Sequence, residues 1–154
     1  KILKIVNKFD IQKLVFWPNP DAGSEDISRG IRKWREKFGD TKTRFFKNLE
    51  QKYFYHVLDK TICLIGNSSS GVREGSFIGV QNICIGSRQK GREIGKNTIM
   101  INNNEKKLTK LIHKILKKKS KNLRDYKYGN GSASKKIIKI LKKIDFKYEK
   151  KLYY

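Results

Sequence analysis

Short apolar runs recur along the chain, and stretches with apolar residues at every third or fourth position separate them. The runs at 12–16, 43–47, 61–66, 81–86 and 97–102 have the length and composition of β-strands. The run at 61–66 and those after it are apolar at odd and even positions alike, which is typical of parallel strands covered on both faces. The sequence therefore predicts strands that alternate with helices.

The helix after the first run, predicted at roughly 25–38, has recognisable ends. Ser24 is the expected N-cap, with acidic Glu25 and Asp26 in the first turn, and Gly39 supplies a stop at the other end. Spacings of four and three place three apolar residues on one face: Ile27, Ile31 and Trp34.

Further helices are predicted at 49–60, 72–79, 105–119 and 132–144. One face of the helix at 49–60 is expected to carry Leu49, Tyr53, Val57 and neighbouring aromatics. The segment 1–9 is either a small leading helix or the tail of a helix that belongs to a preceding unit, and both interpretations stay open.

Strands alternating with helices predict an α/β fold with a Rossmann-like, doubly wound and mostly parallel sheet. A length of 154 residues suits one domain, so a single domain is expected over 1–154. The apolar runs are too short to cross a bilayer, and the first residues lack the pattern of a secretion signal. We therefore expect a cytoplasmic protein with no membrane partner.

A formal net charge of +23 would attract any polyanion. Lys is preferred over Arg and Ile over Val, however, as A+T-rich codons would give, and much of the charge lies on two Lys-rich stretches with helical spacing. Nucleic acid is therefore not the expected partner. A polyanion-binding module built on the Lys-rich C-terminal helices remains an alternative.

Cysteine and histidine usage indicates neither a disulfide framework nor a metal site. Cys63 and Cys84 lie inside apolar, strand-like runs and are expected to be buried free thiols. His56 and His113 have no second ligand at a suitable spacing. We predict no metal and no cofactor.

In an open parallel sheet, ligands bind beyond the carboxyl ends of the strands. The run at 61–66 leads into three hydroxyl residues, and the start of a helix there offers free amides to an anion. Gly71 allows close approach of the backbone, and Glu74 is suited to accept from two sugar hydroxyls. The three hydroxyl residues are Ser68, Ser69 and Ser70. Ordinary helix capping explains one such hydroxyl more readily than three.

Two further loops follow predicted strands. At 17–24, Asn19 could donate to a ligand and accept from it, although ordinary turn chemistry explains the segment equally well. The loop at 86–97 places Arg88, Gln89 and Arg92 after another strand, where the guanidinium groups could meet a diphosphate, and a solvated basic turn is the alternative.

With these loops in view, the sequence from roughly 12 to 144 resembles the UDP-N-acetylglucosamine 2-epimerase family. WPNPDAGS is similar to the family's Pro-Asn-x-Asp-Ala-Gly-Ser segment, and GNSSSGVRE to its Gly-Asn-Ser-Ser-x-Gly-x-x-Glu segment. RQKGR and YGNGSAS are similar to two later motifs in the same order. Gln81 replaces a usual Pro and Asn130 a usual Asp, and neither position carries chemistry.

The resemblance implies the C-terminal half of a glycosyltransferase-B-type fold, the half that chiefly holds the nucleotide. The substrate-binding residues expected from the loops and the resemblance together are Asn19, Leu49, Ser68, Ser69, Ser70, Gly71, Glu74 and Arg88. In that arrangement the first two serines contact the phosphates, Glu74 the ribose, and the backbone near Leu49 the uracil. Asn19 and Arg88 contact the nucleotide-sugar.

The Arg-Gln-x-Gly-Arg sequel resembles the hydrolysing members, which release UDP and free N-acetylmannosamine or a related sugar for sialic-acid-type pathways. The family's acid and base carboxylates and its catalytic His loop lie upstream of the matched motifs, so no catalytic residue is assigned. The expected partners are UDP-N-acetylglucosamine or UDP, the missing N-terminal half and, at full length, a second copy in a homodimer. The chain alone is expected to be inactive. A glycosyltransferase of the same two-half fold is the other alternative.

Overall fold

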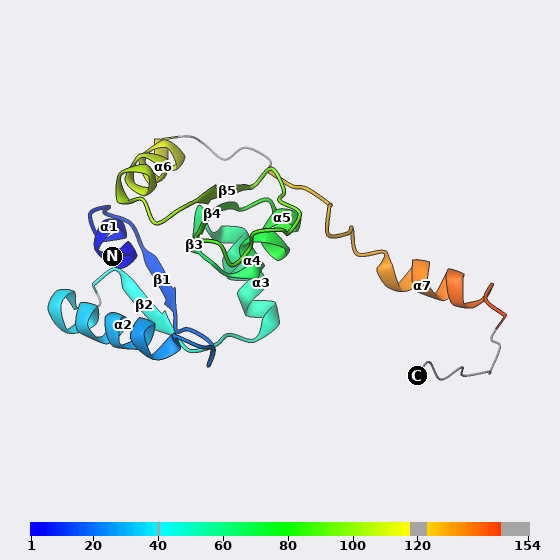
Figure 1. Cartoon of the computed structure of the whole chain (residues 1–154), viewed down its shortest axis with the longest axis horizontal. Helices are drawn as coiled ribbons and strands as arrows, with labels where there is room; N and C mark the ends of the chain where they lie inside the picture. Colours follow the sequence, from blue (N-terminus) through cyan, green and yellow to red (C-terminus); the bar gives the residue numbers. More distant parts are fainter. Residues whose placement is uncertain (40, 118–122, 146–154) are drawn as a thin grey trace, which may run out of the picture.

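The computed structural model of the chain describes residues 1–39, 41–117 and 123–145 (Figure 1). The helices are α1 (Ile2–Val6), α2 (Ser24–Phe38), α3 (Gln51–Lys60), α4 (Ser69–Val72), α5 (Glu74–Ile78), α6 (Glu105–Lys117) and α7 (Ala133–Leu141). The strands are β1 (Lys13–Phe16), β2 (Thr43–Phe46), β3 (Cys63–Gly66), β4 (Gln81–Ile85) and β5 (Thr98–Ile101). The predicted α/β order is confirmed, and the segment 1–9 begins with the short helix α1.

Every strand pair among the described residues is parallel, as predicted, but these strands form two sheets. One sheet has the order β1-β2 and the other β3-β4-β5. Within the described ranges β1 has no hydrogen-bonded neighbour besides β2, so the expected single sheet is divided. Strands of four or five residues offer few ladder bonds, and each pair depends on the helices that cover it.

The main core lies between the three-stranded sheet and the helices α1 and α6. It contains six buried residues, Ile5, Phe9, Ile83, Ile101, Leu108 and Ile112. α6 is amphipathic and turns Leu108 and Ile112 toward the sheet, while its lysines face outward. α4 packs against β4, and α3 contacts α5.

The helix α2 accompanies β1 and β2 (Figure 1). Ile31 and Trp34 are buried as predicted, and the Trp34 ring lies 6.1 Å from that of Phe45. The prediction was wrong for Ile27, which is exposed near the start of the helix. Ser24 is the first helical residue and not the cap, because Gly23, in the left-handed conformation, occupies the cap position.

α3 begins two residues later than predicted and buries the predicted face only in part. Leu49 precedes the helix, and Tyr53 is 54% exposed. Leu58 is buried instead, and Phe54 packs edge-on against Phe16 of β1. Val57 is half-buried as predicted, so the prediction was wrong for Tyr53 and missed Leu58.

The helix predicted at 72–79 is two short helices. α4 and α5 are separated at Arg73, whose backbone angles are φ −93° and ψ −76°. α6 ends at Lys117, and the last two residues predicted for it lie outside the described residues. The division at Arg73 matters because it falls inside the predicted phosphate loop.

α7 extends away from the rest of the chain (Figure 1). None of its nine described residues is buried, although its isoleucines and lysines follow helical spacing. The predicted Lys-rich helix is thus present, and its apolar face is as exposed as its charged face. No described helix is both long and apolar enough to span a bilayer.

Candidate functional site

The structure brings together the three loops that the sequence singled out. The loop after β4 reaches the loop after β3, because Gln89 Nε2 donates to the Asn67 carbonyl oxygen at 2.8 Å. It also reaches the loop after β1, because Arg88 Nη2 lies 2.8 Å from a carboxylate oxygen of Asp21. The site is therefore organised around the connection from β4 to β5.

Residues 67–71, which we call the serine bend, leave the carboxyl end of β3. Ser68 is the N-cap of α4, and its hydroxyl oxygen accepts from the Ser70 amide at 3.3 Å. The hydroxyl oxygens of Ser68 and Ser70 are also 2.7 Å apart. Ordinary capping therefore occurs here. It employs Ser68, which leaves the half-buried Ser69 hydroxyl outside the cap.

The bend has its own amides and hydroxyls to offer to an anion, and it receives little from a helix dipole. α4 has only four residues, and the backbone turns at Arg73 before α5 begins, so little helix dipole accumulates. The amides of Ser68 and Ser69 precede or begin the helix and have no partner within it. Amides and hydroxyls, and not a long helix, are what this bend offers to a phosphate.

Gly71 faces the sheet. A Cβ atom built on it would lie 2.4 Å from Asn82 Oδ1, and its carbonyl accepts from the Asn97 side chain at 2.9 Å. The close approach that requires glycine is therefore the contact with Asn82. A direct role of Gly71 toward a ligand stays a prediction.

Glu74 is the first residue of α5 and is half-buried. Its Oε2 atom is buried and has no hydrogen-bond partner among the described residues. A carboxylate is an acceptor, and a buried acceptor without a donor is unfavourable. A role of the Glu74 carboxylate toward hydroxyl groups of a ligand stays a prediction.

The remaining predicted residues lie on two other loops. Asn19 is exposed after β1, and its carbonyl accepts from the Asp21 amide at 2.7 Å. Leu49 is half-buried between β2 and α3, and its amide donates to Asn48 Oδ1 at 2.9 Å. Arg88 is engaged by Asp21, and both side chains are about half exposed, so a phosphate could compete for the guanidinium.

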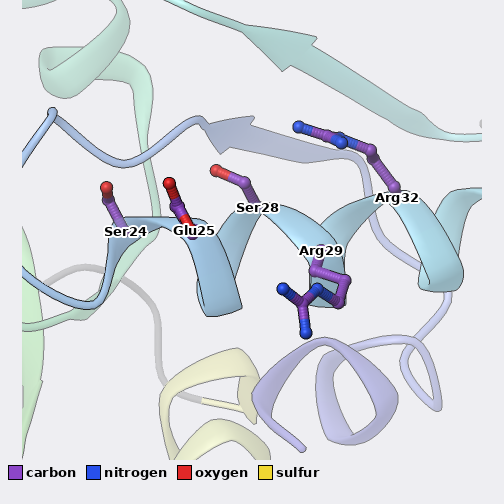
Figure 2. A pocket seen from close by; sticks show the side chains of 5 residues that line it. All are labelled: Ser24, Glu25, Ser28, Arg29 and Arg32. Carbon is purple, nitrogen blue, oxygen red and sulfur yellow. The ribbon is translucent and has the colours of Figure 1, made fainter.

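A polar hollow of about 320 Å³ lies along α2, close to the loop after β1 (Figure 2). Its lining residues are Ser24, Glu25, Ser28, Arg29 and Arg32. Figure 2 shows Ser24, Ser28 and Arg32 projecting to the same side of the helix, as residues four apart should. This hollow was not predicted, although the four-residue spacing of Ser24, Ser28 and Arg32 is visible in the sequence.

The burial of two amide side chains was not predicted. Asn97 is fully buried and donates to the carbonyls of Gly71 and Val80, each at 2.9 Å. Gln89 is 2% exposed, although its loop was interpreted as a polar one. Neither position differs from an ordinary loop residue in hydropathy, so no local pattern could have revealed their burial.

Nucleophilic and metal chemistry find little support in the described part of the chain. Burial raises the pKa of the Cys63 thiol to about 12, and burial also raises the pKa of Cys84. Both free thiols are therefore protonated and unreactive at neutral pH. Over the same residues no group of three or more His, Cys, Asp and Glu could hold a metal ion.

Comparisons with known proteins agree on one family. A family model described as UDP-N-acetylglucosamine 2-epimerase matches residues 1–142. A UDP-N,N'-diacetylbacillosamine 2-epimerase (hydrolyzing) of Legionella pneumophila is 30% identical over 136 residues, which is 88% of this chain and 35% of that protein. A UDP-N-acetylglucosamine 2-epimerase of Neisseria meningitidis serogroup B is 35% identical over 83 residues, 54% of this chain and 21% of that protein.

A solved structure has the same fold. The crystal structure of Methanocaldococcus jannaschii UDP-GlcNAc 2-epimerase in complex with UDP-GlcNAc and UDP has a TM-score of 0.66 and 20% identity. The match covers 92% of this chain and 38% of that one. The chain thus spans about a third of the length of the relatives that it matches most fully.

Proposed function

The chain belongs to the UDP-N-acetylglucosamine 2-epimerase family, and on that basis we propose that it is the C-terminal, nucleotide-binding half of a hydrolysing member. The hydrolysing assignment is supported by the Legionella relative, whose name carries that activity, and by the Arg-Gln-x-Gly-Arg motif. The reaction of the whole enzyme would convert UDP-N-acetylglucosamine and water to UDP and free N-acetylmannosamine or a related sugar.

One observation carries the proposal. At the carboxyl end of β3, the serine bend offers donors, and the buried Glu74 Oε2 offers an acceptor with no partner among the described residues. Donors suit the oxygens of a diphosphate, and an ionised carboxylate suits two neighbouring hydroxyls of a ribose. UDP contains both groups, joined in one molecule.

The proposed binding residues keep the roles that the family resemblance implies. They are Asn19, Leu49, Ser68, Ser69, Ser70, Gly71, Glu74 and Arg88. Arg88 would exchange Asp21 for the diphosphate, a charge-assisted contact that a guanidinium can make with two oxygens at once. Moving a proton at the sugar needs an acid and a base, which we assign to residues outside this chain.

Calorimetric titration of the chain with UDP tests the proposal. UDP and UDP-N-acetylglucosamine should bind with similar affinity, because the shared UDP part makes the contacts. Glu74→Ala should weaken both at least tenfold, whereas Glu36→Ala, which removes an exposed carboxylate on α2, should change neither. No binding of UDP by the unaltered chain, or equal binding by Glu74→Ala, would contradict the proposal.

Activity and polyanion binding separate the alternatives. The chain alone should release no UDP from UDP-N-acetylglucosamine and should transfer no sugar to an acceptor; transfer would indicate a glycosyltransferase. The exposed lysines of α7 favour the polyanion-binding alternative. That alternative expects nucleic-acid binding that falls steeply with salt and survives Glu74→Ala.

A further inference from the structure

We propose that Gln89 is a positioning residue, which aims the Ser68 amide at the diphosphate as one arm of a clamp on the serine bend. The second arm is Asn97. The inference rests on the proposed function, since it concerns how the same site is held in shape.

The clamp grips both ends of the bend. Gln89 Nε2 donates to the carbonyl of Asn67 at 2.8 Å, and Asn97 Nδ2 donates to the carbonyl of Gly71 at 2.9 Å. Both donors come from the connection that leads from β4 into β5, and both side chains are almost completely buried. The first and last carbonyls of the bend are thus fixed from one neighbouring segment.

The planar peptide unit turns this grip into an orientation. The Asn67 carbonyl and the Ser68 amide belong to one trans peptide, so their C=O and N–H bonds point in opposite directions. Gln89 holds the carbonyl toward the protein interior, and the Ser68 N–H is thereby directed away from it. That amide is among the donors that the short helix α4 leaves without an intrahelical partner.

A local helix could not provide this orientation. α4 has four residues and ends at the turn of Arg73, so its own hydrogen bonds fix little of the bend. Donors held in place before the ligand arrives lose less entropy on binding, which is the advantage of a clamp.

The chemistry of Gln89 agrees with a need for its donor. Its Oε1 atom is buried and has no hydrogen-bond partner among the described residues. An acceptor left in that state is costly, and an apolar side chain of the same length would avoid the cost. The amide is therefore explained by what its nitrogen atom holds, which is the Asn67 carbonyl.

The test uses UDP binding to the 154-residue chain carrying Gln89→Met, which keeps the length of the side chain and removes the donor. UDP affinity should fall about tenfold, the equivalent of one hydrogen bond. The affinity for uridine, which has no phosphate, should be the same in Gln89→Met as in the unaltered chain. Gln51→Met, which alters an exposed glutamine on α3, is the matched control and should bind UDP as the unaltered chain does.

Gln89→Glu provides a second measurement, the pH dependence of UDP affinity. A purely structural role of Gln89 would not give the same pH dependence. The ionised carboxylate cannot donate to the Asn67 carbonyl, whereas the protonated carboxyl can. UDP affinity relative to the unaltered chain should therefore be low at pH 8 and recover toward pH 5, where the buried carboxyl gains its proton. All titrations are made at a temperature at which circular dichroism shows each variant folded.

The outcomes separate the two proposals. If the unaltered chain does not bind UDP, the proposed function is wrong. If it binds UDP and Gln89→Met binds equally well, the function stands and the clamp is overturned. A loss of UDP and uridine affinity together, or a flat pH profile for Gln89→Glu, would also overturn the clamp, because either would indicate general damage to the fold.

Discussion

The serine bend and α7 reverse the usual relation between polarity and burial. Beside the bend, Asn97 is fully buried and Gln89 nearly so, whereas Ile138 and Ile140 of α7 are more than half exposed. Asn97 donates to the carbonyls of the buried residues Gly71 and Val80, and Gln89 donates to the carbonyl of Asn67. The apolar side chains of α7 meet no comparable partner among the described residues. Available partners, more than hydropathy, therefore decide which of these side chains are buried.

The largest effect is expected from Asn97→Ala, which removes one of the two buried amide side chains. It leaves the carbonyls of Gly71 and Val80 without their donor, and each buried orphan costs about 1–3 kcal/mol. The free energy of unfolding in urea should fall by roughly 2–5 kcal/mol. Asn103→Ala, at an exposed position, should leave it almost unchanged. Equal stability of the two variants would remove the basis of the comparison.

Gly71→Ala should have the next largest effect. The added methyl group would lie 2.4 Å from Asn82 Oδ1, so the bend or the buried asparagine must move. A loss of about 1–3 kcal/mol is expected in the same urea experiment. Gly30→Ala is the matched control within α2, where a Cβ atom meets nothing within 4 Å. That variant should be stabilised by roughly 0.5–1 kcal/mol, because alanine favours the helix.

Asp21→Ala tests the other tie between the loops, the exposed pair with Arg88. Exposed ion pairs contribute about 0–1 kcal/mol, so the variant should lose less than 1 kcal/mol, and the difference should shrink as salt is added. A double-mutant cycle with Arg88→Ala measures the coupling. A coupling energy as large as the loss expected for Asn97→Ala would show that the exposed ion pair and the buried hydrogen bonds contribute equally to stability.

Ile138→Ala in α7 should have the smallest effect, within about 0.5 kcal/mol, because this exposed side chain loses little contact. Ile112→Ala is the same change in α6, where the side chain is 3% exposed in the main core. It should cost about 2–5 kcal/mol. Similar losses at both positions would show that the face of α7 is covered in solution.

Much of the fold followed from periodicity. The strands and most helices appeared where the apolar runs and helical spacings predicted, because their lengths and neighbours agree with local preference. The helices α6 and α7, which share a pattern of Lys and Ile, show the limit of prediction from periodicity. α6 buries Leu108 and Ile112, whereas α7 buries none of its described residues, and the pattern alone does not say what a helix packs against.

The loops of the candidate site were predicted, but the contacts that hold these loops in place were not. Ser68 and Glu74 could be singled out because hydroxyls and a carboxylate after a buried strand are conspicuous in sequence. The turn at Arg73, the division of the sheet and the burial of Gln89 depend on contacts between distant segments. No pattern within one segment contains that information.

The position of the clamp in the chain has a consequence for biosynthesis. Its donors follow the carbonyls they hold by 22 and 26 residues, on a connection between two parallel strands. A nascent chain extends by roughly 5–20 residues per second, so the bend is synthesised about one to five seconds before its last support. The proposed nucleotide site should therefore be completed only once the connection into β5 has been synthesised.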